Sequence, residues 1–286
     1  MKKILVPTDF SACAGKALEF AVQCSKILPA EVTLIHAFEI KGDLYTDYMG
    51  VNREFNQSLL EDAHRKLESL RENIEAREGV LITTKLYQFS LEESILKATR
   101  DQGIDFIVMG TSGASGLKEK LFGSRTASVI GKSPVPVLAI PHEYNWKKPE
   151  KILLATNHFE EEPVLLNFLF EIGDLLLAQV QAVVFTDEDD DKAVTFLEHK
   201  RKIPQYEQVL KERYKEERLS VVHLYGTEFE EKLQEYIRKN EIDVLAMITY
   251  HKKFSERLFH PSLTKKMSYH TTIPLLAIPA KMKGTT

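Results

Sequence analysis

The chain has 286 residues, of which 43% are hydrophobic and 28% charged, and it carries a formal net charge of −4 at pH 7. It has no apolar run near the ~20 residues that a membrane-spanning helix requires. Neither half has the excess of Lys and Arg that is typical of nucleic-acid-binding proteins. We therefore expect a soluble, globular protein whose partners include neither a membrane nor a nucleic acid.

The start of the chain and its cysteines bear on where the protein resides. The sequence opens with MKKILVPTDF, which has neither the apolar segment nor the cleavage site of an export signal. Cys13 and Cys24 lie in one predicted helix at a separation of about 16 Å, which is too long for a disulfide. We expect a cytoplasmic protein, because thiols stay reduced in that compartment.

Short apolar runs alternate with amphipathic segments along the chain. The runs are rich in β-branched residues, as strands buried on both faces of a sheet should be. In chain order they are KILVP from residue 3, VTLIHAF from residue 32, LITTKLYQF from residue 81, IDFIVMG from residue 104 and VPVLAI from residue 135. The spacing of an amphipathic helix is found at Ala14, Leu18, Ala21 and Val22, at Leu60, Ala63, Leu67, Leu70 and Ile74, and at Phe229, Leu233, Tyr236 and Ile237.

Three sequence patterns occur twice in the same order. They are KKILVPTDFS at residue 2 and EKILLATNHF at 150, GIDFIVMGT at 103 and EIDVLAMIT at 241, and VPVLAIP at 135 and IPLLAIP at 273. Such repetition indicates a duplicated unit, and we expect domains at residues 1–144 and 149–281. The alternation of strands and helices predicts an α/β fold of two tandem Rossmann-like domains, each a five-stranded parallel sheet with helices on both faces.

A glycine-rich segment follows the fourth predicted strand. GTSGASGLKEKLFGS, from residue 110, holds four of the chain's 13 glycines and ends at Ser124, where a helix is predicted to begin. Glycine lets backbone N–H groups approach a phosphate, and a helix N-terminus favours an anion. Because parallel sheets bind ligands at the carboxyl ends of their strands, the segment is well placed for this role. It matches neither a P-loop nor a Rossmann fingerprint, and from spacing alone a loop without function stays an equal alternative.

The glycine spacing also resembles a known signature. Gly110, Gly113, Gly123 and Ser124 reproduce Gly-x2-Gly-x9-Gly-Ser/Thr, the nucleotide-binding signature of the universal stress protein family. KKILVPTDFS, LIHAF and PVPVLAIP resemble the first, second and last strands of that family. Since both halves are covered, the chain resembles a tandem universal stress protein with an ATP-binding type of first domain and the fold of the adenine nucleotide alpha hydrolase-like group.

The resemblance implies a binding role for specific residues, with ATP, together with Mg²⁺, as the cofactor. Asp9 and Ala37 would hold the adenine, and Pro7, Thr8 and Met109 would line the pocket. Gly110 and Gly113 would follow the ribose and phosphates, Gly123 would allow close approach, and Ser124 would donate to the phosphates. Thr126 is a further candidate, as is Arg125, which would pair with a phosphate or lie on a solvated helix face.

The second unit lacks these features. Ile248, His251, His260 and Pro261 replace the three glycines and the serine, and Asn157 replaces Asp9. We therefore expect that this unit does not bind ATP in the same way. His251, His260 and His270 suggest zinc, but their spacing matches no tight ligand pair. We favour polar residues of a degenerate loop without a metal, and another small ligand stays open.

No nucleophile, general base or held metal is evident, so we expect no dedicated enzyme and no catalytic residues. The leading hypothesis is a stress-response sensor or regulator whose ATP-dependent surface is offered to a protein partner. The alternatives are a slow ATP-hydrolysing enzyme and a scaffold that acts through its domain interface.

Two further expectations concern assembly. From the family resemblance, VPVLAIP and IPLLAIP would pair within the chain as a pseudo-dimer, and tandem chains would form a homodimer. The segment 40–55 is absent from the second unit, and it would either cover the adenine or pack on the neighbouring domain.

Overall fold

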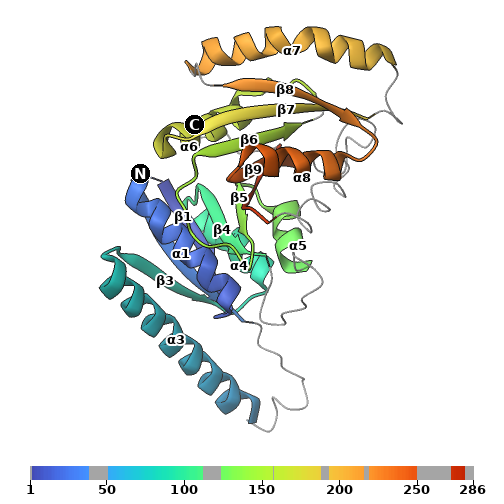
Figure 1. Cartoon of the computed structure of the whole chain (residues 1–286). Coiled ribbons are helices and arrows are strands. Elements are labelled where there is room, and N and C mark those ends of the chain that lie inside the picture. The colour runs from blue at the N-terminus through green and yellow to red at the C-terminus, as the bar shows by residue number, and fades with distance from the viewer. Residues whose placement is uncertain are drawn as a thin grey trace.

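The computed structural model describes residues 2–38, 51–111, 124–156, 158–187, 193–215, 219–249 and 272–280 (Figure 1). The first unit contains β1 (Lys2–Pro7), α1 (Ala12–Ile27), β2 (Ala30–Ala37), α3 (Val51–Glu78), β3 (Ile82–Tyr87), α4 (Leu91–Gln102), β4 (Phe106–Gly110), α5 (Ser124–Lys132) and β5 (Val137–Ile140). The second contains β6 (Lys151–Thr156), α6 (Pro163–Leu176), β7 (Gln179–Asp187), α7 (Ala193–Tyr214), β8 (Ser220–Gly226), α8 (Phe229–Asn240), β9 (Val244–Thr249) and β10 (Leu275–Pro279).

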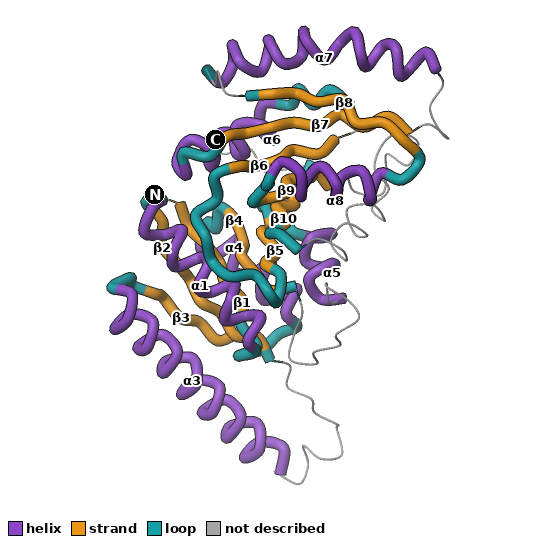
Figure 2. The backbone as a smooth tube through the Cα atoms, in the orientation of Figure 1, coloured by secondary structure: helices purple, strands orange, loops and turns teal. Residues whose placement is uncertain are grey.

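Within the described residues, ten strands form one continuous sheet in the order β3-β2-β1-β4-β5-β10-β9-β6-β7-β8. The two halves of this order are mirror images of each other, so each unit contributes the same five-stranded parallel arrangement. The units meet at β5 and β10, which lie side by side near the middle of Figure 2 and are antiparallel, with Leu138 opposite Leu276. The strands VPVLAIP and IPLLAIP therefore do pair within the chain.

The strand registers agree with the duplication read from the sequence. Ile4 pairs with Phe106 in the first unit, and Ile152 pairs with Val244 in the second. A carboxylate closes the start of each central strand, because Asp105 accepts from the backbone N–H of Lys3 at 2.7 Å and Asp243 accepts from that of Lys151 at 3.0 Å. The duplicated residues thus occupy equivalent places in the two halves of the sheet.

Helices cover both faces of the sheet, as the buried apolar strands require. Neighbouring strand residues point to opposite faces, so Ile4 packs in the core beneath α1, α3, α6 and α7, whereas Leu5 packs beneath α4, α5 and α8. Figure 1 shows α1 and α3 on the left of the sheet and α5 and α8 on its right. No helix of the described residues is both long and apolar enough to span a membrane.

The segment between the units is tied to both of them. Trp146 packs edge-on against Phe20 of α1 with ring centroids 4.8 Å apart, and Lys147 pairs with Asp243 of the second unit. Lys16 of α1 also donates to the side chain of Asn145 at 2.8 Å. These contacts hold the connection against the sheet.

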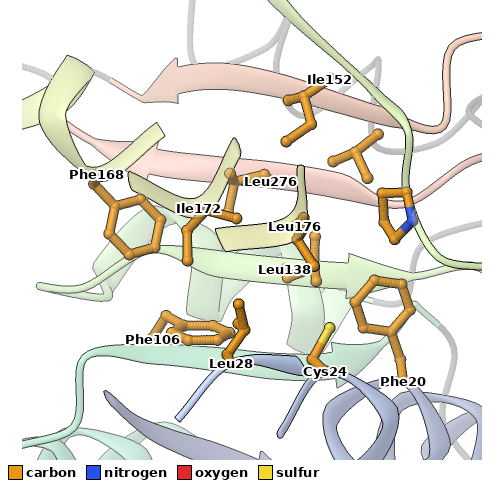
Figure 3. Close-up of a pocket in the computed structure, with 12 residues that line it drawn as sticks. Phe20, Cys24, Leu28, Phe106, Leu138, Ile152, Phe168, Ile172, Leu176 and Leu276 are labelled. Atoms are coloured by element: carbon orange, nitrogen blue, oxygen red, sulfur yellow. The ribbon is translucent and has the colours of Figure 1, made fainter. Parts of the chain in front are cut away.

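A small apolar cavity of about 30 Å³ lies where the two units meet. Figure 3 shows side chains of α1 and α6 facing it from either side of the strand that carries Leu138. Much of its lining consists of residues related by the duplication, which are Phe20 and Phe168, Cys24 and Ile172, Leu28 and Leu176, Phe106 and Val244, and Leu138 and Leu276. The cavity therefore lies on the approximate twofold axis of the molecule.

Candidate functional site

The described residues among those that the sequence singles out lie at one edge of the sheet, in the first unit. β1 lies between β2 and β4, so the carboxyl ends of these three strands are neighbours. We call this place the carboxyl edge. Of the predicted residues that the structure describes, Pro7 ends β1 and Thr8 and Asp9 follow it, Ala37 ends β2, and Met109 and Gly110 end β4. Gly113 and Gly123 lie outside the described residues.

The turn after β1 is fixed by its own side chains. The buried Thr8 accepts a hydrogen bond at Oγ1 from the backbone N–H of Phe10 at 3.0 Å. Asp9 accepts at Oδ1 from the backbone N–H of Ser11 at 3.0 Å. Ser11 in turn caps α1, and Phe10 has a left-handed φ of 62°, which is strained for a residue with a side chain. The turn therefore fixes the orientation of the Asp9 carboxylate.

His36 supports the same turn and is not predicted from the sequence as a site residue. Its Nδ1 lies 2.7 Å from the carbonyl oxygen of Thr8, and its ring lies 4.6 Å from that of Phe10. The sequence signal for His36 is only its place at the end of the second strand. These contacts indicate that His36 stabilises the turn after β1.

Gly110 has a structural role that the sequence does not reveal. A Cβ atom at this position would lie 2.7 Å from Sγ, 2.8 Å from the carbonyl oxygen and 2.9 Å from the carbonyl carbon of Cys13. Because two of these atoms belong to the backbone of α1, any side chain would displace the helix. The close approach that requires glycine here is between β4 and α1, whether or not a ligand is also near.

The first turn of α5 lies beside the end of β4. The helix begins at Ser124, as the sequence predicts, and Ser124 and Arg125 are exposed. Thr126 is only 3% exposed, and its hydroxyl donates to the carbonyl oxygen of Gly110 at 2.9 Å. The first turn contains no acidic residue, so its free N–H groups and the helix dipole favour an anion.

The equivalent edge of the second unit is built differently. Ile248 stands in the place of Gly110, is 5% exposed and packs in the core beneath α6. Ala12, where α1 begins, corresponds to Glu160, but α6 begins only at Pro163. The later start of the helix leaves room for the Ile248 side chain. Asn157, His251, His260, Pro261 and His270 lie outside the described residues.

A polar cluster that the sequence does not predict ties α7 to the second sheet. The buried Thr186 lies within hydrogen-bond distance of two imidazoles through Oγ1, at 2.7 Å from Nδ1 of His199 and 2.8 Å from Nε2 of His223. Burial, followed by the nearby His199 and Lys200, lowers the pKa of His223. The described residues contain no group of three His, Cys, Asp or Glu side chains able to hold a metal ion. We therefore interpret the cluster as packing of α7 on the sheet.

The fold and the carboxyl edge define an α/β protein of two Rossmann-like units, the first with its predicted binding residues gathered at the strand ends. Residues 1–141 match the family model described as the universal stress protein family. The chain is 34% identical over 153 residues to a universal stress protein of Methanocaldococcus jannaschii, covering 49% of this chain and 94% of that protein. It is 30% identical over 146 residues to the universal stress protein YxiE of Bacillus subtilis, covering 48% of this chain and 97% of that protein.

The chain belongs to the universal stress protein family. A solved structure of a universal stress protein from Archaeoglobus fulgidus matches with a TM-score of 0.72 and covers 97% of this chain and 98% of that chain. The identity to that structure is 17%, so this likeness concerns the fold. Because the match covers nearly the whole chain, the likeness of fold includes both units.

Proposed function

We propose that the chain binds ATP, with Mg²⁺ on its phosphates, at the carboxyl edge of the first unit, and that it acts as a nucleotide-dependent regulator in a stress response. The observation that carries this proposal is the placement of Asp9, Gly110 and the start of α5 at the ends of adjacent strands, where doubly wound sheets bind ligands. Bound nucleotide would change the surface that this edge offers to a protein partner.

The β1 turn is suited to the adenine. A carboxylate only accepts hydrogen bonds, and adenine presents its N6 amino group as a donor. The hydrogen bond from Ser11 holds the Asp9 carboxylate in one orientation. Guanine carries an acceptor oxygen in place of the amino group, so Asp9 would favour adenine over guanine.

The start of α5 is suited to the phosphates. Ser124 supplies a hydroxyl and Arg125 a positive charge at the N-terminus of a helix whose first turn contains no acidic residue. Mg²⁺ usually binds nucleotides through phosphate oxygens and water rather than through a cage of protein ligands, so the proposal requires no set of carboxylates at this edge. Asp9 is the acidic residue among the predicted binding residues, and we place it at the adenine, away from the reacting phosphate. A binding role is therefore favoured over turnover.

The second unit would not bind ATP in the same way, because Ile248, His251, His260 and Pro261 replace the three glycines and the serine of the signature. We expect about one nucleotide per chain by isothermal titration calorimetry, and an adenine nucleotide released on denaturation of the freshly purified protein. Two nucleotides per chain would contradict the asymmetry. An absence of binding at saturating ATP would refute the proposal, and hydrolysis above about 1 per second would indicate an enzyme.

The variant Asp9→Asn tests the adenine contact. The amide oxygen still accepts from the N–H of Ser11, so the turn is kept, but an NH₂ donor replaces one carboxylate oxygen. We expect ATP affinity to fall about tenfold and the preference for ATP over GTP to diminish, since a charge-assisted hydrogen bond is lost. Asp101→Asn on the exposed face of α4 is the matched control and should bind as the wild type. Unchanged selectivity in Asp9→Asn would exclude a role for this carboxylate.

A further inference from the structure

Thr126 joins the two sides of the segment that carries the glycine signature. Gly110 ends β4 before that segment, and Thr126 lies in the first turn of α5 after it. The Thr126 hydroxyl donates to the carbonyl oxygen of Gly110 at 2.9 Å, and the side chain is 3% exposed. The hydroxyl therefore faces the strand, and the residue is shielded from solvent.

Gly110 is itself held on two sides. It pairs with Ile140 of β5, and the next residue, Thr111, donates its backbone N–H to the Ile140 carbonyl oxygen at 3.0 Å. On another side it lies directly against Cys13 of α1. A hydrogen bond to such a fixed carbonyl group gives the first turn of α5 a defined position relative to the sheet.

The rest of α5 is held further along the helix. Its other buried residues are Val129 and Ile130, and Lys132 near its end pairs with Glu92 of α4. The hydrogen bond from Thr126 ties the first turn of this nine-residue helix to β4. Removing it would free the helix start while the helix end stays attached.

We propose that Thr126 is a positioning residue for phosphate binding rather than a residue that contacts the nucleotide, an inference that rests on the proposed function. The main chain of Gly110 and the hydroxyl of Ser124 would act on one nucleotide, so the distance between them must suit it. Thr126 sets that distance from within the core. Adenosine has no phosphates, so it would depend on the residues at the adenine and the ribose, such as Asp9 and Ala37, and would not sense the start of α5.

The variant Thr126→Val removes the hydroxyl and keeps the shape of the side chain. We expect ATP affinity to fall about five- to tenfold, the equivalent of one lost hydrogen bond, with adenosine affinity unchanged in a competition assay. Thr126→Ser restores the hydroxyl and should recover most of the ATP affinity. Thr99→Val is the matched control, because the buried Thr99 hydroxyl also donates to a backbone carbonyl, that of Ile95, but within α4.

Each outcome decides between the two proposals. Wild-type affinity for ATP in Thr126→Val overturns the positioning role while ATP binding stands. An equal loss of ATP and adenosine affinity in Thr126→Val, or failure of Thr126→Ser to recover, also overturns it, because a general disturbance would then explain the effect. If the wild-type protein binds no ATP, both the proposed function and this inference fall.

Discussion

Two equivalent residues end helices in the left-handed conformation, one with a side chain and one without. Gly103 ends α4 with a φ of 64°, and Glu241 ends α8 with a φ of 54°. They correspond in the duplication, as the repeated GIDFIVMGT and EIDVLAMIT show. The first unit therefore uses the residue suited to this conformation, and the second retains the conformation with a residue that is strained in it.

Glu241→Gly should stabilise the protein. The substitution relieves the left-handed strain, and the net gain is about 1 kcal/mol after the greater freedom of glycine in the unfolded chain is counted. Little is lost, because the Glu241 side chain is 86% exposed and its pair with Lys151 spans 4.0 Å. We expect a higher midpoint of urea unfolding.

Gly103→Ala is the matched change in the other unit and should destabilise by a similar amount, since a Cβ is then forced into the same conformation. No neighbouring atom lies within 4 Å of that Cβ, so the backbone alone accounts for the effect. A lower urea midpoint for Glu241→Gly would show that its side chain contributes more than the strain costs.

At the scale of elements, one carboxylate links α1 to α3. Glu78 at the end of α3 accepts from Lys26 at 2.7 Å and from Gln23 at 3.0 Å, both in α1, and from its neighbour Arg77 at 2.7 Å. The hydrogen bonds from Lys26 and then Arg77 lower the pKa of Glu78 to about 2. The ionised form is thus favoured in the folded protein.

This depressed pKa predicts a pH-dependent contribution to stability. A carboxyl whose pKa is lower in the folded state stabilises fully above its unfolded value of 4.5, and the contribution is lost as the pH falls through about 2. Glu78→Gln should therefore lower the urea midpoint at pH 7, and the difference from the wild type should shrink below pH 4.5. Glu72→Gln, at an exposed site on the same helix, should change little. A difference that is constant from pH 7 to about pH 3 would contradict an ionic origin.

The sequence predicts elements well where burial imposes a pattern. The five apolar runs of the first unit became β1 to β5, and the predicted start at Ser124 is the start of α5. By contrast, α3 begins at Val51, inside the segment 40–55 that the sequence treats as an insertion. The apolar spacing noted in the sequence starts only at Leu60, so it predicts the later turns of this helix and not its start.

The candidate site is likewise predictable only where a local sequence pattern marks its residues. Asp9, Gly110 and Ser124 follow from their places at the ends of elements. The contact of Gly110 with Cys13 and the bond from Thr126 join residues far apart in the chain or across an intervening segment, and no local pattern encodes them. Likewise, the packing of His199 and His223 around Thr186 depends on how α7 lies on the sheet.

At the scale of the molecule, the cavity between the units reflects one departure from symmetry. Cys24 of α1 and Ile172 of α6 are equivalent residues that line it from opposite sides. Burial raises the pKa of the Cys24 thiol to about 12, so the group is neutral. The smaller side chain on the first side leaves space that the larger one fills on the other.

Cys24→Val should fill part of this space and stabilise the contact between the units. A cavity of about 30 Å³ costs on the order of 1 kcal/mol by the relation between cavity volume and stability. We expect a higher urea midpoint, followed by the fluorescence of Trp146, which is the single tryptophan and packs on Phe20 beside the cavity.

Cys13→Val is the control, because Cys13 lies tightly against Gly110, so added volume should destabilise there. Stabilisation by both substitutions would point to removal of the thiols as the cause. Destabilisation by Cys24→Val would show that the junction is already closely packed.

The antiparallel ladder of β5 and β10 also has an evolutionary consequence. In an assembly of two identical chains, every mutation changes both halves at once, so a loss on one side is a loss on the other. A single polypeptide removes that constraint and lets natural selection act on each copy separately. Isoleucine could then be accepted at position 248 while glycine persisted at position 110, leaving one ancestral copy free to specialise.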